Sequence, residues 1–246
     1  MKITVCIPMY NEEAIAADCA KALYGALSAF AESTGDTYEV IFCDDGSSDE
    51  CTNRVHDYEK WLDHTKVDIK EIGYAINRGK GCAVRTAICA STGDIVLYTD
   101  CDLAYGTDVI GEAVAKLKQS GDDLLIGSRN LSDDGYEGYT PIRKIASKTY
   151  IKVLNLFAGF KLSDSQCGFK AFRGDKGRKI FSYCTTDGFA FDIEALMIAS
   201  RLGYKIGEMG VKIVNHRESK VHVVRDTFRM LNDLRIIKGK VRKLEL

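Results

Sequence analysis

The feature that most constrains the fold is a regular alternation of two kinds of segment along the chain. Short apolar runs rich in β-branched residues recur at residues 3–8, 38–43, 67–72, 94–99 and 123–128. Between these runs lie longer segments with helical spacing, of which residues 11–32 and 80–92 are the clearest. Strands that alternate with helices predict a mostly parallel sheet covered by helices on both faces. The expected fold class is therefore α/β.

Composition narrows the classes of protein to consider. The 246 residues are 46% hydrophobic, enough for a large globular domain with a substantial core. Lysine and arginine number 34 against 35 aspartates and glutamates, so no basic excess indicates a nucleic-acid partner. Nine cysteines form no CxxC pair, which indicates free thiols in a reducing compartment. Since no run approaches the roughly 20 apolar residues of a membrane-spanning helix, we expect a cytoplasmic protein, peripheral to a membrane at most.

Beyond residue 129 the alternation loosens into an elaborated C-terminal half. A polar, glycine-rich loop precedes a predicted helix over 142–159, and a second helix near 190–202 precedes a strand over 205–214. Residues 223–246 repeat apolar residues every three or four positions and carry seven lysines and arginines against three acidic residues from 225 onward. Two interpretations of this basic amphipathic segment stay open: it lies on a membrane surface, or it packs on the core with a solvated basic face.

Polar residues gather directly after three of the predicted strands. These clusters are MYNEE at 9–13, DDGSSDE at 44–50 and DCDLAYG at 100–106. In an open parallel sheet, ligands bind in the crevice beyond the carboxyl ends of the strands. The three clusters therefore predict one binding site at that edge of the sheet.

Asp100 and Asp102 point to the same side of an extended segment, because they are two residues apart. Two unpaired carboxylates so close repel each other unless a cation holds them together. A hard divalent ion such as Mg²⁺ or Mn²⁺ binds through one or two carboxylates together with substrate phosphates. The alternative is structural: one aspartate caps the following helix and the other is solvated. An EF-hand calcium loop does not fit, since Tyr105 replaces its glycine.

The first two clusters each have a binding and a structural interpretation. Asp44 and Asp45 suit hydrogen bonds to a nucleobase or a ribose, although a plain turn explains them as well. Pro8 ends the first strand, Tyr10 offers a ring for stacking on a base, and Asn11 is a candidate helix cap. Further along, glycines on both sides of Lys80 at a helix start suit backbone N–H groups and an ammonium that approach a phosphate.

Together and in this order, the motifs resemble the family-2 inverting glycosyltransferases of the GT-A fold. The donor-side motifs are IPMYNEE at 7–13, DDGSSDE at 44–50, NRGKGCAVRTA at 77–87 and TDCDLAYG at 99–106. Those of the second half are GSRN at 127–130, RKIASKTYIKVLN at 143–155, SDSQCGFKAF at 163–172, GFAFDIEALMIASRLGYKIGEMGV at 188–211 and NHRESKV at 215–221. This second set is similar to the branch that makes polyprenyl-phosphate sugars, which includes the dolichyl-phosphate mannose and glucose synthases.

The resemblance implies a Rossmann-like, mostly parallel sheet with an acceptor-side C-terminal half, a GT-A domain over residues 1–222 and a helical tail over 223–246. The implied reaction is metal-dependent inverting transfer of a hexose, from a donor of the UDP-glucose or GDP-mannose type, to a polyprenyl or dolichyl phosphate. The implied cofactor is Mg²⁺ or Mn²⁺. Because a phosphate monoester is already anionic at neutral pH, the acceptor needs no strong general base.

The resemblance also assigns roles to residues. Those implied to bind the nucleotide sugar are Pro8, Tyr10, Asn11, Glu12, Asp44, Asp45, Asn77, Gly79 and Lys80, with Gln166 and Glu194 facing the sugar. Those implied to act in catalysis are Asp100 and Asp102 on the metal, Arg129 and Arg143 on the acceptor phosphate with Ser147 nearby, and Arg217 and Lys220 on phosphates from the C-terminal side.

Two departures from the family pattern bear on the substrates. Ala104 stands where many mannose synthases of this branch carry a polar metal-site residue, which argues against mannose. No membrane hairpins follow the catalytic motifs, so a polyprenyl acceptor would be reached through the basic C-terminal helix or a membrane partner subunit. Two other functions stay open. A soluble saccharide or small-molecule acceptor is disfavoured by Arg143 and the NHRESK motif, and a non-catalytic nucleotide-binding module by the intact carboxylates.

Overall fold

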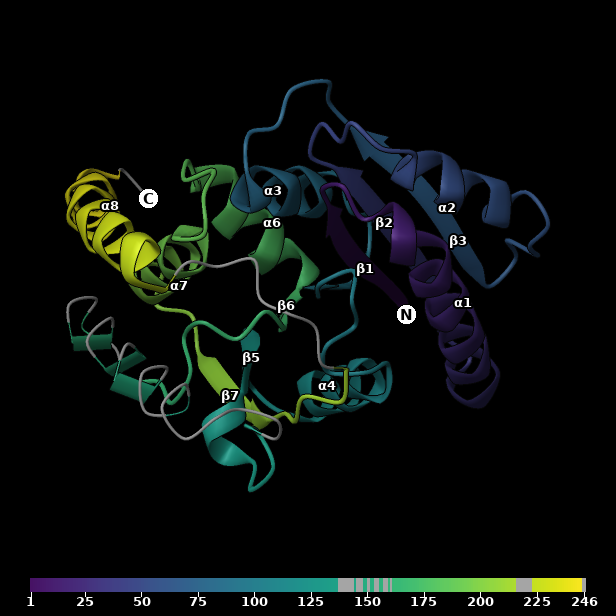
Figure 1. The fold of residues 1–246 in the computed structure, drawn as a ribbon. Coiled ribbons are helices and arrows are strands. Elements are labelled where there is room, and N and C mark those ends of the chain that lie inside the picture. The colour runs from purple at the N-terminus through teal and green to yellow at the C-terminus, as the bar shows by residue number, and fades with distance from the viewer. Residues whose placement is uncertain are drawn as a thin grey trace.

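The computed structural model describes residues 1–136, 144, 148–149, 151–152, 155–156, 159, 161–215 and 223–244, with the backbone alone over 223–232. It contains one seven-stranded sheet in the order β3-β2-β1-β4-β6-β5-β7. Helices cover both faces of the sheet, as Figure 1 shows. The predicted α/β class is confirmed.

The first half of the chain follows the predicted alternation closely. Its elements are β1 (Lys2–Met9), α1 (Glu13–Thr34), β2 (Thr37–Asp44), α2 (Cys51–Glu59), β3 (Val67–Gly73), α3 (Lys80–Ala90) and β4 (Ile95–Tyr98). These four strands run parallel. Alternate residues of β1 pack on opposite faces: Ile3, Val5 and Ile7 join a core with α1 and α2, whereas Cys6 joins a second core with α3.

The second half departs from a purely parallel order. Its elements are α4 (Asp108–Gln119), β5 (Leu124–Ser128), the short η1 (Arg129–Leu131), β6 (Lys170–Arg173), α6 (Gly174–Tyr183), α7 (Phe191–Arg201), β7 (Ile206–Gly210) and α8 (Val223–Lys243). β6 runs antiparallel between β4 and β5. It was missed in the sequence because it is only four residues long and begins with a lysine. The strand predicted over 205–214 ends at Gly210.

Helix α1 is long and apolar enough, by length and composition, to cross a membrane, so the expectation that no segment reaches this size was wrong. Its apolar residues nevertheless have a structural explanation. Ala16, Ala20, Leu23, Leu27 and Ala31 recur along one side of the helix, and all are at most 1% exposed in the core beneath it.

Helix α8 lies beside α7 at the left of Figure 1. Leu234, Ile237 and Val241 are buried against the second core. The Arg201 guanidinium of α7 donates to the carbonyls of Arg242 (2.9 Å) and Leu244 (2.8 Å), which satisfies backbone groups at the end of α8. Over residues 233–244, the interpretation of a helix packed on the core therefore holds, with its basic side chains outside.

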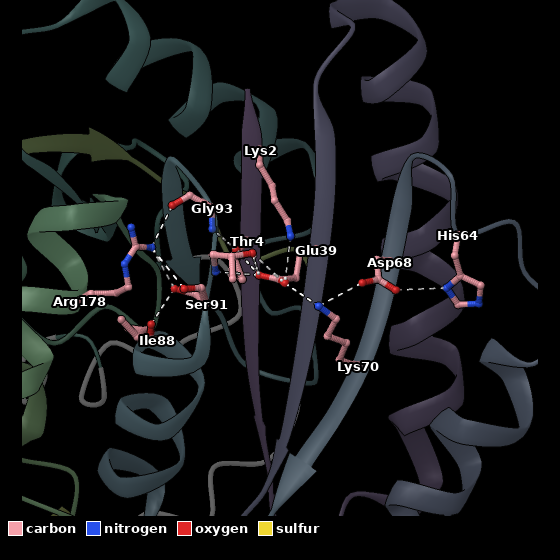
Figure 2. A network of polar contacts seen from close by, with 11 residues as sticks. Lys2, Thr4, Glu39, His64, Asp68, Lys70, Ile88, Ser91, Gly93 and Arg178 are labelled. Carbon is pink, nitrogen blue, oxygen red and sulfur yellow. Dashed lines mark hydrogen bonds and ion pairs between the residues drawn. The ribbon is translucent and has the colours of Figure 1, made fainter.

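Glu39 lies near the amino ends of the strands, at the edge opposite the polar clusters. Its side chain is 1% exposed and pairs with Lys2 (3.2 Å) and Lys70 (2.9 Å), as Figure 2 shows. The Thr4 hydroxyl also donates to it (2.7 Å). Burial alone would raise the pKa of Glu39, but the bonds from Lys70, Thr4, Thr92 and Lys2 outweigh it and lower the pKa to about 2.

Candidate active site

The three polar clusters meet at the carboxyl edge of the sheet, as predicted from parallel strands. The first two are joined by Asn11, whose side-chain oxygen accepts a bond from the Ser48 N–H (2.9 Å) and whose own N–H donates to the Ser47 hydroxyl (2.9 Å). Asn11 does not cap α1, contrary to the sequence prediction. The Asp49 carboxylate accepts the bond from the Glu13 N–H (2.9 Å) in the first turn of that helix.

Asp45 holds the loop between β3 and α3 against the end of β2. Its side chain is 3% exposed and accepts bonds from the Tyr74 hydroxyl (2.6 Å), the Asn77 amide (2.8 Å) and the N–H groups of Arg78 and Gly79 (both 2.9 Å). With these four donors in the loop, Asp45 positions Asn77 and Gly79. Its predicted direct contact with a nucleoside stays a prediction.

The remaining residues of the predicted nucleoside site line the same edge. Asp44 accepts bonds from the N–H and hydroxyl of Ser47 (2.9 and 2.6 Å) and from the Thr52 hydroxyl (3.2 Å), which ties it to the start of α2. Tyr10 is 45% exposed, as expected for a ring that is available for stacking. Pro8 lies inside β1, which continues to Met9, and Glu12 directly precedes α1.

Lys80 and Asp100 form an ion pair at the centre of the edge. The Lys80 side chain is 23% exposed and that of Asp100 35% exposed, so both are reachable by a ligand. Burial alone would lower the pKa of the Lys80 ammonium, but the charges of Asp100, Asp192 and Asp102 together raise it above its usual value. Lys80 is therefore fully charged at neutral pH.

Two backbone N–H groups at the start of α3 are already bonded within the protein, contrary to the interpretation that they face a phosphate. The N–H groups of Gly81 (2.7 Å) and Cys82 (3.3 Å) donate to the carbonyl of Asp187. Gly79 has φ +116°, and a Cβ there would lie 2.6 Å from the same carbonyl, so this close approach requires glycine. The partly exposed Lys80 ammonium is the group of this motif that remains able to contact a diphosphate. No sequence pattern had singled out Asp187.

The segment after β7 lies against the Asp102 loop. The Asn215 amide donates to the carbonyl of Leu103 (2.9 Å), and the Val214 N–H donates to the carbonyl of Ala104 (2.8 Å). The Asp102 carboxylate accepts a bond from the Ala104 N–H (3.0 Å). Asn215 therefore lies against the loop that carries the predicted metal ligand Asp102. Four predicted site residues lie outside the described part of the chain: Arg143, Ser147, Arg217 and Lys220.

The surroundings of Asp100 fit a divalent metal ion. A Cβ at Gly168 would lie 2.7 Å from a carboxylate oxygen of Asp100, so a larger residue there would displace this carboxylate from its place beside strand β6. Asp100 and Asp102 supply carboxylate oxygens, the donors that Mg²⁺ and Mn²⁺ prefer, while no thiol competes, since the neighbouring Cys101 is buried. Gly168 stood in a motif whose predicted functional residue was Gln166.

Arg129 is already paired with a buried carboxylate. Its guanidinium donates to both oxygens of Asp164 (2.6 and 3.0 Å), and Asp164 has no exposed surface. Burial alone would lower the pKa of Arg129, but the bonded Asp164 outweighs burial and raises it well above its usual value. The Gln166 N–H also donates to Asp164 (3.3 Å). Arg129 thus holds the 163–166 segment in place, and its predicted contact with an acceptor phosphate stays a prediction.

Glu194 does not face the donor sugar, in contrast to the sequence prediction. Its side chain is 1% exposed, and it accepts bonds from the N–H groups of Thr185 (2.9 Å) and Thr186 (2.7 Å). The acid near the site is Asp192, which accepts bonds from the Tyr98 hydroxyl and from the fully buried Lys170 ammonium (2.6 Å). The FDIE motif contains both acids, and spacing alone does not distinguish them.

Sequence comparison agrees with this geometry. The family model for Glycosyl transferase family 2 matches residues 4–181, which is most of the chain. The chain belongs to glycosyl transferase family 2. The family-2 chain is similar to the dolichyl-phosphate beta-glucosyltransferase of Drosophila melanogaster, with 31% identity over 96% of this chain and 74% of that protein. A Saccharomyces cerevisiae protein of the same name is 30% identical with the same coverage. The protein is accordingly a glycosyltransferase.

Solved structures of this enzyme class share its fold. Glucosyl-3-phosphoglycerate synthase from Mycobacterium tuberculosis, in complex with uridine diphosphate, matches with a TM-score of 0.69 and 19% identity. The match covers 97% of this chain and 80% of that one. The same synthase in complex with Mn²⁺, uridine diphosphate and glucosyl-3-phosphoglycerate matches with a TM-score of 0.66. At this identity the likeness establishes the fold, which supports the predicted GT-A architecture.

Proposed function

We propose that this glycosyltransferase moves glucose from UDP-glucose to the phosphate of a dolichol or another polyprenol, with inversion and with a divalent metal ion at Asp100 and Asp102. The observation that carries the proposal is the cluster of Lys80, Asp100 and Asp102 at the carboxyl edge of the sheet. The names of the relatives at about 30% identity support glucose and dolichyl phosphate over the alternatives.

On the donor side, each described residue has a distinct task in this proposal. Tyr10 offers an exposed ring to the base, and Asp44 and Asn77 offer polar groups to the nucleoside. Asp45 fixes the loop that carries Asn77 and Gly79. A bound Mg²⁺ or Mn²⁺ would supply charge stabilisation for the departing diphosphate. Lys80 would neutralise the same diphosphate from the other side, and Gln166 would lie near the sugar.

On the acceptor side, the chemistry requires cations and not a base. A phosphate monoester is a nucleophile without proton removal, so its binding and orientation limit the reaction. Arg143, Arg217 and Lys220 are the proposed ligands of the acceptor and donor phosphates. Asn215, bonded to the Asp102 loop, supports this assignment because Arg217 and Lys220 follow it within five residues in the sequence. Arg129 contributes by positioning the 163–166 segment through Asp164.

A polyprenyl acceptor also requires access to a membrane, and we propose a cytoplasmic protein that is peripheral to one. Helix α8 supports this because its described side chains outside the core are mostly basic: Arg235, Lys238, Lys240, Arg242 and Lys243. Each lysine or arginine near an anionic surface favours binding by about 1 kcal/mol. Liposome co-sedimentation with and without anionic lipid tests this part separately from catalysis.

The experiment is a transfer assay with a full donor and acceptor matrix. Purified protein is incubated with UDP-glucose or GDP-mannose, with dolichyl phosphate or a soluble saccharide, and with Mg²⁺, Mn²⁺ or EDTA. We expect a glucolipid from UDP-glucose and dolichyl phosphate that disappears with EDTA and in Asp102→Asn. Asp57→Asn, which changes an exposed carboxylate on α2, is the matched control. Transfer to the saccharide alone would favour the soluble-acceptor alternative, and binding without turnover the non-catalytic one.

A further inference from the structure

Lys80 and the proposed metal ion use the same carboxylate. The Lys80 ammonium pairs with one oxygen of Asp100, and the other oxygen faces Gly168. A Cβ built at Gly168 lies 2.7 Å from that oxygen and 3.8 Å from the Lys80 nitrogen, so the three groups are in close contact. A divalent ion that approaches Asp100 therefore meets an ammonium already bound there.

The formal charges around this point explain why the pairing matters. Asp100, Asp102 and Lys80 sum to one negative charge, while Asp192 nearby is offset by its partner Lys170. A divalent ion alone would turn this balance into one positive charge, with Lys80 repelling it. The two negative charges of a nucleotide-sugar diphosphate return the balance to one negative charge and give the ammonium a new partner. As judged from the described residues, binding of the metal and binding of the diphosphate therefore favour each other, because Lys80 repels the first and attracts the second.

We propose that Lys80 is an exchangeable counter-ion of Asp100, which keeps the free enzyme from binding the divalent ion tightly and makes metal and nucleotide diphosphate bind together. When both arrive, the ammonium leaves Asp100 for the diphosphate and the carboxylate becomes a metal ligand. The inference rests on the metal site of the proposed function. It gives Lys80 a second role, in the order of binding, beyond contact with the donor.

Mn²⁺ binding measured by electron paramagnetic resonance, with and without UDP, tests this role without any turnover. The variants are Lys80→Met, which keeps the stem and removes the charge, and Lys80→Arg, which keeps the charge. One other group of metal-binding side chains occurs among the described residues, His56, Glu59 and Glu71. All proteins therefore carry Glu71→Gln, so that this group does not contribute to the signal. Circular dichroism confirms that each variant is folded, and Lys80→Gln replaces Lys80→Met if it is not.

An opposite charge within a few ångströms shifts the proton affinity of a carboxylate by at least about tenfold, and a divalent ion should respond at least as much. We expect Lys80→Met to bind Mn²⁺ about tenfold more tightly than the parent protein without UDP, and to show a smaller effect of UDP. Lys80→Arg should behave like the parent. Equal Mn²⁺ affinity of Lys80→Met and the parent without UDP would overturn the inference and leave the metal site intact. If the parent protein binds no Mn²⁺ in the presence of UDP, or if Asp102→Asn binds Mn²⁺ as well as the parent does, the metal site itself is refuted. The inference then falls with it.

Discussion

Glu39 provides a quantitative test of the structure far from the active site. Its carboxylate is buried under the amino ends of β1 and β2 and accepts bonds from two lysines and two threonines. The substitution Glu39→Gln removes the charge and keeps the size of the side chain. Since Lys2 and Lys70 remain, the variant leaves both ammonium groups without their buried partner, and we expect it to be less stable at neutral pH.

The magnitude follows from the pKa of Glu39, which lies at about 2 in the folded protein against an ordinary value of 4.5. Each unit of difference corresponds to about 1.4 kcal/mol, so the charged form contributes on the order of 3 kcal/mol to the free energy of unfolding. Because the folded pKa is depressed, this contribution is complete above the unfolded pKa and is lost as pH falls toward 2. About 2 kcal/mol of it should be gone at pH 3.

Urea unfolding of the parent and of Glu39→Gln at pH 7, 5 and 3, followed by circular dichroism, measures this difference directly. We expect the gap in unfolding free energy to be largest at pH 7, little changed at pH 5 and much smaller at pH 3. A gap that stays constant across the three pH values would refute the reasoning, because it would show that the carboxylate has the same pKa in both states.

Three further predictions concern other parts of the fold. Burial and the nearby Glu59 raise the pKa of Glu71. The charged form of Glu71 therefore opposes folding at any pH above the ordinary pKa of a glutamate. Glu71→Gln should raise the urea midpoint at pH 7 and leave it unchanged at acidic pH. Gly168→Ala should weaken UDP and Mn²⁺ binding in calorimetry with little change in the circular dichroism spectrum, because the new methyl group displaces Asp100. Arg129→Met should leave Asp164 buried without its partner and cost roughly 3–5 kcal/mol in urea unfolding, and an unchanged midpoint would contradict the bidentate pairing.

Much of the donor half was predictable because its strands are apolar and three of them are followed by polar residues. Parallel strands bring such residues to one edge, so Asp44 and Asp100 were placed at that edge without knowledge of the fold. What the sequence could not indicate was which polar group bonds to which. Asn11 is a residue type that favours helix caps, and it lies at a suitable position. Its side-chain oxygen instead accepts a bond from the Ser48 N–H, while the Asp49 carboxylate from another loop accepts the bond from the first turn of α1.

The acceptor half was less predictable, for two physical reasons. β6 carries only four residues, including the buried Lys170, and its antiparallel position follows from long-range packing that no local pattern encodes. Glu194 and Asp192 are both acidic and lie one helical turn or less apart, so their environments differ only in the folded protein. Arg143, Arg217 and Lys220 remain predictions from motif resemblance.

The antiparallel β6 has a consequence for how this enzyme class can diversify. Residue Ile126 of β5 pairs with Lys170 of β6, and the Gly127 N–H donates to the Phe169 carbonyl (2.9 Å), so the chain leaves and re-enters the sheet at one point. Anything inserted between those two points is anchored at both ends beside the active site. A lineage could therefore exchange residues 132–162 for a longer or shorter segment, and acquire a new acceptor, while the register of every strand and the donor site stayed the same.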